Sequence, residues 1–157
     1  MDFIFLGLGA NLGDAQKNLN LAIEYLKQEN DIQVQAQSSF YQSAPVDAIG
    51  NDFINCVIQI SSQLQPLDLL KKCHAIESRL GRIRSFRNAP RAIDIDILLF
   101  GNEIVCYPNL TIPHPRLTTR SFALLPLIEI CEDIHIPTQG LARNYLLETA
   151  HQVIKKI

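Results

Sequence analysis

Two aspartates separated by one residue, Asp94 and Asp96, are the side chains whose type and spacing point most directly to chemistry. They alternate with Ile93, Ile95 and Ile97, which is typical of a β-strand and places both carboxylates on the same side. Their Cβ atoms are then about 6 to 7 Å apart. Because carboxylate oxygens suit Mg²⁺, the pair predicts a site for two such ions. Solvated acids on an exposed strand face are the alternative for a bare pair of this kind.

Five arginines precede this pair within a segment that contains no acid: Arg79, Arg82, Arg84, Arg87 and Arg91. Guanidinium groups bind phosphate through paired hydrogen bonds, so the segment predicts a polyphosphate site beside the metal. Phosphoryl transfer depends chiefly on positioning and charge neutralisation, which such a site would supply. A solvated helix end is the alternative for Arg79 and Arg82, because arginines favour the C-terminal dipole. It explains Arg87 and Arg91 less well.

Two further segments carry weaker signals. Pro113 to Arg116 and Arg120 to Phe122 form a second basic group, which by itself favours a capped surface turn over a binding site. The glycines of residues 7–13 have the wrong spacing for a dinucleotide-binding fingerprint, and the chain has no Gly-Lys-Ser/Thr triplet. We expect these glycines to form a tight turn.

The elements that position these residues follow the order strand, helix, strand, strand, helix, strand. Apolar spacing predicts strands at 3–8, 32–36, 53–60 and 92–100, and helices around 19–26 and from Pro66 to about Leu80. Gly101-Asn102 predicts a hairpin from the last strand to residues 103–106. The prolines of the last third predict short helices and loops, with at most a short strand at 134–136. This order is typical of an α+β, ferredoxin-like βαββαβ sandwich, an antiparallel sheet with both main helices on one face.

The composition indicates one domain over residues 1–157, with 47% apolar residues. A net charge of −2 gives no general attraction to nucleic acid or anionic membranes, so neither is an expected partner. No apolar run approaches the roughly 18 residues of a membrane span, and the start lacks a basic leader. The four cysteines form no Cys-x-x-Cys pair, so we expect reduced thiols in a cytoplasmic protein and no zinc site. We also expect a monomer.

Four motifs together resemble one known family. They are Gly9-Ala10-Asn11-Leu12-Gly13-Asp14, Ser39-Phe40-Tyr41, the run Arg87 to Leu98, and Pro113-His114-Pro115-Arg116. In this order and spacing the chain is similar, over nearly its whole length, to the hydroxymethyldihydropterin pyrophosphokinases. The resemblance implies a ferredoxin-like fold, in agreement with the order of elements. It also implies transfer of pyrophosphate from ATP to 6-hydroxymethyl-7,8-dihydropterin, with release of AMP, in folate biosynthesis.

The same resemblance implies roles for individual residues. Asp94 and Asp96 would bind two Mg²⁺ ions that bridge the ATP phosphates, while Arg82 and Arg91 would steady the transferred group. The pterin ring would stack between two aromatic rings and be read at its edge by polar groups. This pterin site would comprise Ser43, Ala44, Val46, Phe53, Asn55 and Phe122. The ATP site would comprise Leu70, His74, Glu77, Arg84, Arg87, Arg91, Ile97, Thr111, His114 and Arg120.

Three positions depart from the family pattern: Asn88 replaces a frequent tryptophan, Asn109 replaces an arginine that can contact ATP, and Phe53 replaces a tyrosine. Two other functions are open to such a chain. One is a metal-dependent phosphohydrolase or nuclease that activates water, against which the lack of a further carboxylate and histidine cluster argues. The other is a non-catalytic, ferredoxin-like anion-binding module, which turnover with Mg²⁺ and ATP would exclude.

Overall fold

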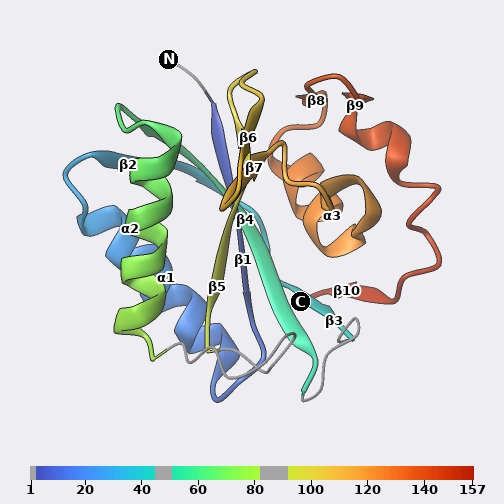
Figure 1. The fold of residues 1–157 in the computed structure, drawn as a ribbon. Helices are drawn as coiled ribbons and strands as arrows, with labels where there is room; N and C mark the ends of the chain where they lie inside the picture. The colour runs from blue at the N-terminus through green and yellow to red at the C-terminus, as the bar shows by residue number, and fades with distance from the viewer. Residues whose placement is uncertain (1–2, 45–50, 82–91) are drawn as a thin grey trace.

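The computed structural model describes residues 3–44, 51–81 and 92–157, and its centre is an antiparallel sheet of six strands (Figure 1). β4 and β1 lie in the middle and β5 forms one edge. On the other side of β4, β2 and β3 pair with successive parts of that strand, and β10 pairs with β3. The strands of the sheet are β1 (Ile4–Ala10), β2 (Ile32–Gln37), β3 (Tyr41–Ser43), β4 (Phe53–Ser62), β5 (Asp94–Phe100) and β10 (Ile154–Lys156).

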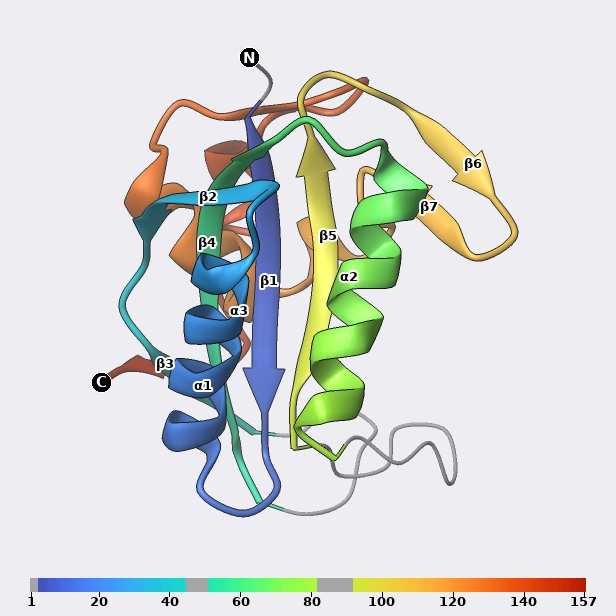
Figure 2. The ribbon, with the colours of Figure 1, turned by 90° about the vertical axis from the view of Figure 1, so that its left-hand side faces the viewer.

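Two helices, α1 (Ala15–Gln28) and α2 (Pro66–Arg79), cover one face of the sheet (Figure 2). α1 begins after Asp14, whose carboxylate accepts a hydrogen bond from the Lys17 N–H (3.1 Å) and caps the helix. Pro66 begins α2, where its fixed φ suits the first turn. The apolar stripe of α1 is buried as helical spacing predicts: Leu19, Ala22, Ile23 and Leu26. The predicted ferredoxin-like α+β class is confirmed by this arrangement.

The opposite face of the sheet is covered by α3 (Ser121–Ile130) and the chain that follows it (Figure 1). Leu124 and Leu127 of α3 belong to a second apolar cluster that includes Phe5 and Val57 of the sheet. The neighbouring short elements are the 3-10 helices η1 (Leu117–Thr119) and η2 (Ala142–Tyr145) and the strands β8 (His135–Ile136) and β9 (Gly140–Leu141). Among the residues that the structure describes, no helix is both long enough and apolar enough to cross a membrane.

The central strands alternate their side chains between these two faces. Leu8 of β1 and Ile95 of β5 are paired across the sheet and pack in the cluster beneath α1 and α2. Gly9 and Asp94, the adjacent pair, therefore face the side that α3 covers. The alternation predicted for β4 is confirmed, since its members in the cluster beneath α1 and α2 are Ile54, Cys56, Ile58 and Ile60.

The predicted hairpin between the 92–100 strand and residues 103–106 is wrong. The chain does turn at Gly101, but β6 (Val105–Tyr107) pairs with β7 (Leu110–Ile112) instead of β5. The outer edge of β5 receives a different partner, because the backbone N–H of His114 donates to the carbonyl of Leu98 (2.9 Å). The expectation of at most one short strand in the last third is also wrong, because β7, β8, β9 and β10 all lie there.

The early glycines do not all form the tight turn that their spacing predicts. Gly7 and Gly9 lie inside β1, where they pair with residues of β4 and β5 on either side. Gly13 alone of the three lies in the turn before α1, with a φ of 67° that glycine adopts readily. Because they are two residues apart on the strand, Gly7 and Gly9 face the same side, where Gly7 lies against Leu98 and Gly9 lies against Asn55.

Candidate active site

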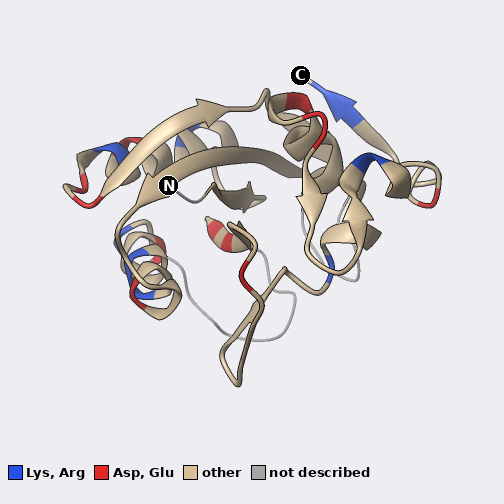
Figure 3. Cartoon of the chain, turned by 90° about the horizontal axis from the view of Figure 1, so that it is seen from above, with Lys and Arg blue, Asp and Glu red and all other residues tan. Residues whose placement is uncertain are grey.

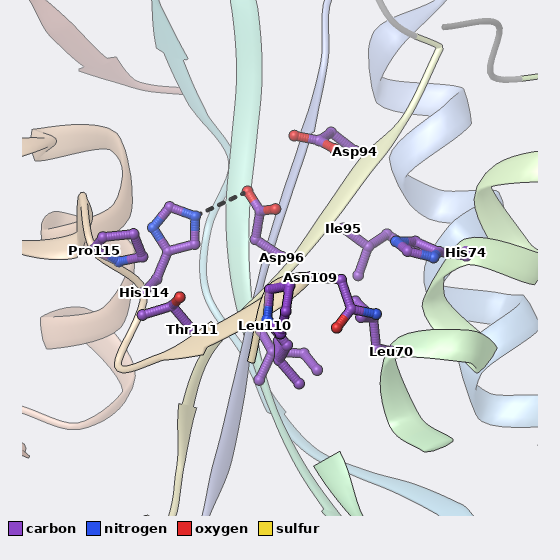
Figure 4. Close-up of a pocket in the computed structure, with 12 residues that line it drawn as sticks. Leu70, His74, Asp94, Ile95, Asp96, Asn109, Leu110, Thr111, His114 and Pro115 are labelled. Carbon is purple, nitrogen blue, oxygen red and sulfur yellow. Dashed lines mark ion pairs between the residues drawn. The ribbon is translucent and has the colours of Figure 1, made fainter. Parts of the chain in front are cut away.

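A cavity of about 340 Å³ opens beside β5 (Figure 4). It lies between α2, the outer edge of β5, the β6–β7 hairpin and the loop that follows β7. The structure brings together here seven of the residues that the sequence predicts for the metal and ATP sites: Leu70, His74, Asp94, Asp96, Ile97, Thr111 and His114. Asn109, which departs from the family pattern, lines the same cavity.

Asp94 and Asp96 enter the cavity from β5, and both carboxylates are partly exposed. Their position follows from the strand, because alternate residues of β5 face the same side. Within the described ranges, no group of three or more His, Cys, Asp and Glu side chains could hold a metal ion. Two carboxylates alone fit Mg²⁺ in the form it takes beside nucleotides, where phosphate oxygens and water fill the remaining positions.

His114 faces Asp96 from the loop that follows β7, with 3.9 Å between Nε2 and Oδ2 (Figure 4). Its Nδ1 accepts a hydrogen bond from the Arg116 N–H (3.1 Å), so the proton of the neutral ring lies on Nε2. Burial, and secondly the positive charge of Arg120, lower the pKa of His114 to about 4. At neutral pH the ring is therefore an uncharged donor whose Nε2–H lies beside Asp96.

Glu77 is not among the residues that line this cavity, although the resemblance places it in the ATP site. It is 2% exposed on α2, and its Oε2 accepts a hydrogen bond from the Ile95 N–H (2.8 Å). Ile95 lies between the two aspartates, so Glu77 fixes the backbone that carries them. Its role in binding ATP stays a prediction.

Phe53 and Asn55, two of the residues predicted for the pterin site, lie on the α3 side of the sheet, as Asp94 does. The register of β4, β1 and β5 pairs Gly9 of β1 with Asn55 of β4 and with Asp94 of β5. Asn55, Gly9 and Asp94 therefore form a row across the sheet and face the same side. Because neighbouring strands are about 4.8 Å apart, the outer two backbones are separated by about 10 Å. The backbone of Gly9 is the floor between them.

Asn55 is held in this row by a buried hydrogen bond from its Nδ2 to the Ser43 Oγ (3.1 Å). Its Oδ1 lies over Gly9, only 2.6 Å from where a Cβ at that position would stand. Phe53, one of the predicted stacking residues, is also near this point, with its Cδ1 at 3.7 Å. The structure therefore brings Ser43, Phe53 and Asn55 together, while Ala44 is exposed at the end of β3.

Phe122 and Arg120 belong to the start of α3. The Arg120 guanidinium lies over the Phe122 ring, with 5.3 Å from Cζ to the ring centroid. Arg120 is also close enough to His114 to lower the pKa of the imidazole. It thus links His114, which is predicted to bind ATP, with the aromatic side chain predicted to stack on the pterin.

Several predicted residues lie outside the described ranges: Val46, Arg82, Arg84, Arg87 and Arg91, together with Asn88. Sequence reasoning missed other parts of the site. Pro108, Leu110 and Pro115 line the cavity, but they belong to the β6–β7 hairpin and its following loop, which the sequence did not place correctly. Gly9 could have been recognised as a position of close approach, because a glycine within a strand leaves room for a neighbouring side chain.

Comparison with known proteins gives consistent results. The family model described as 7,8-dihydro-6-hydroxymethylpterin-pyrophosphokinase (HPPK) matches residues 5–132. The 2-amino-4-hydroxy-6-hydroxymethyldihydropteridine pyrophosphokinase of Haemophilus influenzae is 36% identical over 153 residues, which is 96% of each chain. The protein of the same name from Bacillus subtilis is 39% identical over 131 residues, which is 83% of this chain and 78% of its own.

A similar fold occurs in the crystal structure of wild-type Plasmodium falciparum HPPK-DHPS with pteroate, with a TM-score of 0.73 over 94% of this chain. The two chains are 15% identical, and the match spans 42% of the Plasmodium chain, so this likeness concerns the fold. The sequence match and the relatives of nearly equal length identify the family. This chain belongs to the 7,8-dihydro-6-hydroxymethylpterin-pyrophosphokinase family, as its motifs predict.

Proposed function

We propose that the chain transfers pyrophosphate from ATP to the hydroxymethyl group of 6-hydroxymethyl-7,8-dihydropterin, with Mg²⁺ held by Asp94 and Asp96. Family membership supports the transfer reaction and its place in folate biosynthesis. The structural observation that carries the proposal is the row of Asn55, Gly9 and Asp94 across three strands. It sets a buried amide suited to the edge of a heterocycle beside a carboxylate suited to a metal.

Different residues would bind the pterin and the phosphate groups of ATP. Asn55, whose Oδ1 covers Gly9, would hydrogen-bond the pterin edge, with the hydroxymethyl arm of the pterin directed toward the Asp94 side. The neutral His114 would donate its Nε2–H to a phosphate oxygen. When bound, Mg²⁺ neutralises charge on the phosphate oxygens and lowers the pKa of a hydroxyl that it coordinates.

The reaction is attack of the hydroxymethyl oxygen on the β-phosphorus of ATP, with AMP as the leaving group. The fixed row of the sheet contributes by aligning the two substrates, which can supply much of the rate acceleration in a reaction of this kind. Glu77 supports that alignment because its hydrogen bond to the Ile95 N–H fixes the strand between the two aspartates.

The test is to mix the protein with Mg²⁺, ATP and 6-hydroxymethyl-7,8-dihydropterin and identify the nucleotide product. We expect AMP and the pterin diphosphate in equal amounts, and no turnover when Mg²⁺ is chelated. Formation of ADP, or no turnover, would contradict the proposal. Release of phosphate without pterin would indicate the phosphohydrolase alternative, and ATP binding without turnover would indicate the anion-binding module.

The proposed compartment is the cytoplasm. All four cysteines are free, and Cys56 and Cys73 are buried thiols whose pKa values burial raises to about 12. Such thiols stay protonated and unreactive, as expected of packing residues in a reducing compartment. A monomeric state without nucleic-acid or membrane partners stays a prediction, which sedimentation of the purified protein can check.

A further inference from the structure

The C-terminal segment, residues 149–157, lies beyond the residues that the family model matches and runs from the start of α3 to β3. We call it the C-terminal strap. Its last part is β10, which carries Lys155 and Lys156 and lies at the end of the chain in Figures 1 and 3. It is anchored at Thr149, which is 2% exposed and whose hydroxyl donates to the Leu146 carbonyl (3.2 Å).

The side-chain amide of Gln152 makes two hydrogen bonds to the junction between η1 and α3. Its Oε1 accepts from the Ser121 N–H (2.8 Å), and its Nε2 donates to the Thr119 carbonyl (2.7 Å). The two bonded residues flank Arg120, and Ser121 precedes Phe122. One amide therefore fixes the backbone on both sides of Arg120.

The first turn of α3 needs such a partner. Arg120 is the N-cap residue of α3, and in the described part of the chain its side chain makes no capping hydrogen bond. A helix start has backbone N–H groups without partners inside the helix, and an oxygen acceptor there is stabilising. The Gln152 Oε1 supplies that acceptor from a segment about thirty residues later in the chain. The direction in which α3 presents Phe122 therefore depends on the strap.

The other end of the strap holds the opposite wall of the pterin site. Ile154 pairs with Ser43 in the β10–β3 ladder, and the Ile157 N–H donates to the Phe40 carbonyl (2.9 Å). Ser43 in turn accepts the hydrogen bond that orients Asn55 (3.1 Å). The strap thus contacts both the residues that carry Phe122 and the strand that supports Asn55.

We propose that Gln152 is a positioning residue for the pterin side of the site, acting through Arg120 and Phe122. This inference rests on the proposed function, because it assumes that Phe122 stacks on the substrate. Without the Gln152 amide, the start of α3 would sample other directions and the aromatic slot would be formed only part of the time. The apparent affinity for pterin is then the intrinsic affinity multiplied by the fraction of time that the slot is formed.

The test compares Gln152→Ala with the parent by calorimetry of pterin binding, with Mg²⁺ and a non-hydrolysable ATP analogue present. We expect pterin affinity to fall about tenfold, which is the scale of losing one to two net hydrogen bonds. The Michaelis constant for pterin should rise similarly, while that for ATP should rise less, because Arg120 borders the two lost hydrogen bonds but Leu70 and Thr111 are untouched. The Ser121 amide should exchange its hydrogen faster.

Two further variants separate positioning from general stability. His151→Ala alters the exposed neighbour of Gln152 and should leave both affinities unchanged. Gln152→Glu keeps an acceptor for the Ser121 N–H but places a carboxylate oxygen against the Thr119 carbonyl, so it should lower pterin affinity with slow Ser121 exchange retained.

Pterin affinity within twofold of the parent in Gln152→Ala would overturn the inference and leave the proposed function intact. So would equal losses for ATP and pterin accompanied by a lower melting temperature, since that result indicates a structural role. A parent protein that binds no pterin would overturn the proposed function, and this inference with it.

Discussion

The strands β4, β1 and β5 contribute to an apolar core on one face of the sheet and to the candidate active site on the other. Toward α1 and α2, β1 and β5 present large apolar side chains such as Leu8 and Ile95, which are 2% exposed. Toward α3, the adjacent positions are Gly9 and Asp94, paired across the same two strands. Side chains alternate along a strand. A substitution at one residue is therefore expected to change the stability of the fold, and a substitution at the next residue to change binding or turnover.

The two faces also differ in how their helices are attached. α1 and α2 pack on the sheet through one continuous apolar cluster. α3 has an apolar cluster of its own, but polar contacts from Gln152 and Glu129 join it to the strap and to the chain around β3. Close apolar packing allows a helix little displacement. Hydrogen bonds from a side chain orient a helix, and breaking one of them costs less free energy than opening a cavity in the core. The substitutions below test this contrast.

The largest effect is expected on the site face, from Asp94→Ala or Asp96→Ala. Each should lower turnover on the order of 10³-fold, about 4 kcal/mol in the barrier, because a metal-binding carboxylate is lost. The melting temperature should stay the same or rise slightly, since one of two adjacent like charges is removed. AMP formation and thermal unfolding measure the two effects.

Asp94→Asn provides the control, because it keeps the shape of the side chain and removes its charge. We expect it to be nearly as inactive as the alanine variant unless Mg²⁺ is raised well above the level that saturates the parent. Activity within tenfold of the parent for both alanine variants would contradict the metal role. Loss of the folded state would indicate a structural role instead.

The second effect is on the core face, one residue away from the site on β1. Leu8→Ala should lower the free energy of unfolding by about 3 kcal/mol, because it removes buried methyl groups and leaves a cavity. Turnover per folded molecule should change little below the melting temperature. Denaturant titration gives the stability change. A Michaelis constant for either substrate raised more than tenfold, with stability unaffected, would show that the two faces are not separable.

A smaller effect is expected at the floor of the site. In Gly9→Ala the added Cβ would stand 2.6 Å from the Asn55 Oδ1, so the amide has to move and its bond to Ser43 is disturbed. We expect pterin affinity to fall about tenfold, and the free energy of unfolding to fall by about 1 kcal/mol because a buried hydrogen bond is disturbed. Calorimetry with pterin measures this loss.

Gly7→Ala is the matched control on the same face of β1. Its Cβ would stand 3.2 Å from the Cδ1 of Leu98, a buried leucine of the cluster under α3, so the contact affects packing and leaves Asn55 in place. The effect on pterin affinity should therefore stay within about threefold. Equal losses in the two glycine variants would show that the floor, and not the position of Asn55, determines pterin binding.

These contrasts show which features the sequence could predict. β4 and β5 alternate in sequence and in burial, so the faces of Ile54 and Asp94 follow from periodicity alone. The helix bounds follow equally from local signals, since Asp14 caps α1 and Pro66 begins α2. The motif around Asp94 and Asp96 is specific enough to indicate the family from the order and spacing of its residues, and the family match confirms it.

The features that could not be predicted depend on contacts between distant parts of the chain. β6 has no local signal that favours β7 over β5 as its partner, because Gly101-Asn102 is as good a hairpin turn as Pro108-Asn109. An acid such as Glu77 on a helix is usually exposed, yet its carboxylate is buried and accepts a hydrogen bond from the Ile95 N–H. Gln152 contacts the start of α3 only in the folded chain, so no spacing in the sequence predicts this contact.

The smallest effect concerns the attachment of α3 to the chain around β3 through Glu129. Its carboxylate accepts hydrogen bonds from the Tyr41 hydroxyl (2.6 Å) and from the Ser39 N–H and hydroxyl (3.0 and 2.8 Å). Partial burial raises the pKa of Glu129, but these hydrogen bonds outweigh it, so the pKa lies below the usual value of 4.5. A carboxylate with a lowered pKa stabilises the folded state in its charged form.

Glu129→Gln should therefore destabilise the protein by about 1 kcal/mol at pH 7, because an amide is a weaker acceptor and the site is partly exposed. The stability contributed by the charged carboxylate is fully present above about pH 4.5 and is lost as the pH falls through the lower, folded-state pKa. The difference between parent and variant should hence be constant from pH 7 to about pH 5 and shrink below pH 4.5. Urea titrations across this range measure it, with Glu132→Gln, an exposed position just after α3, as control. A difference that grows on acidification would mean that Glu129 is held protonated by Tyr41, and that α3 is joined to β3 by a neutral pair.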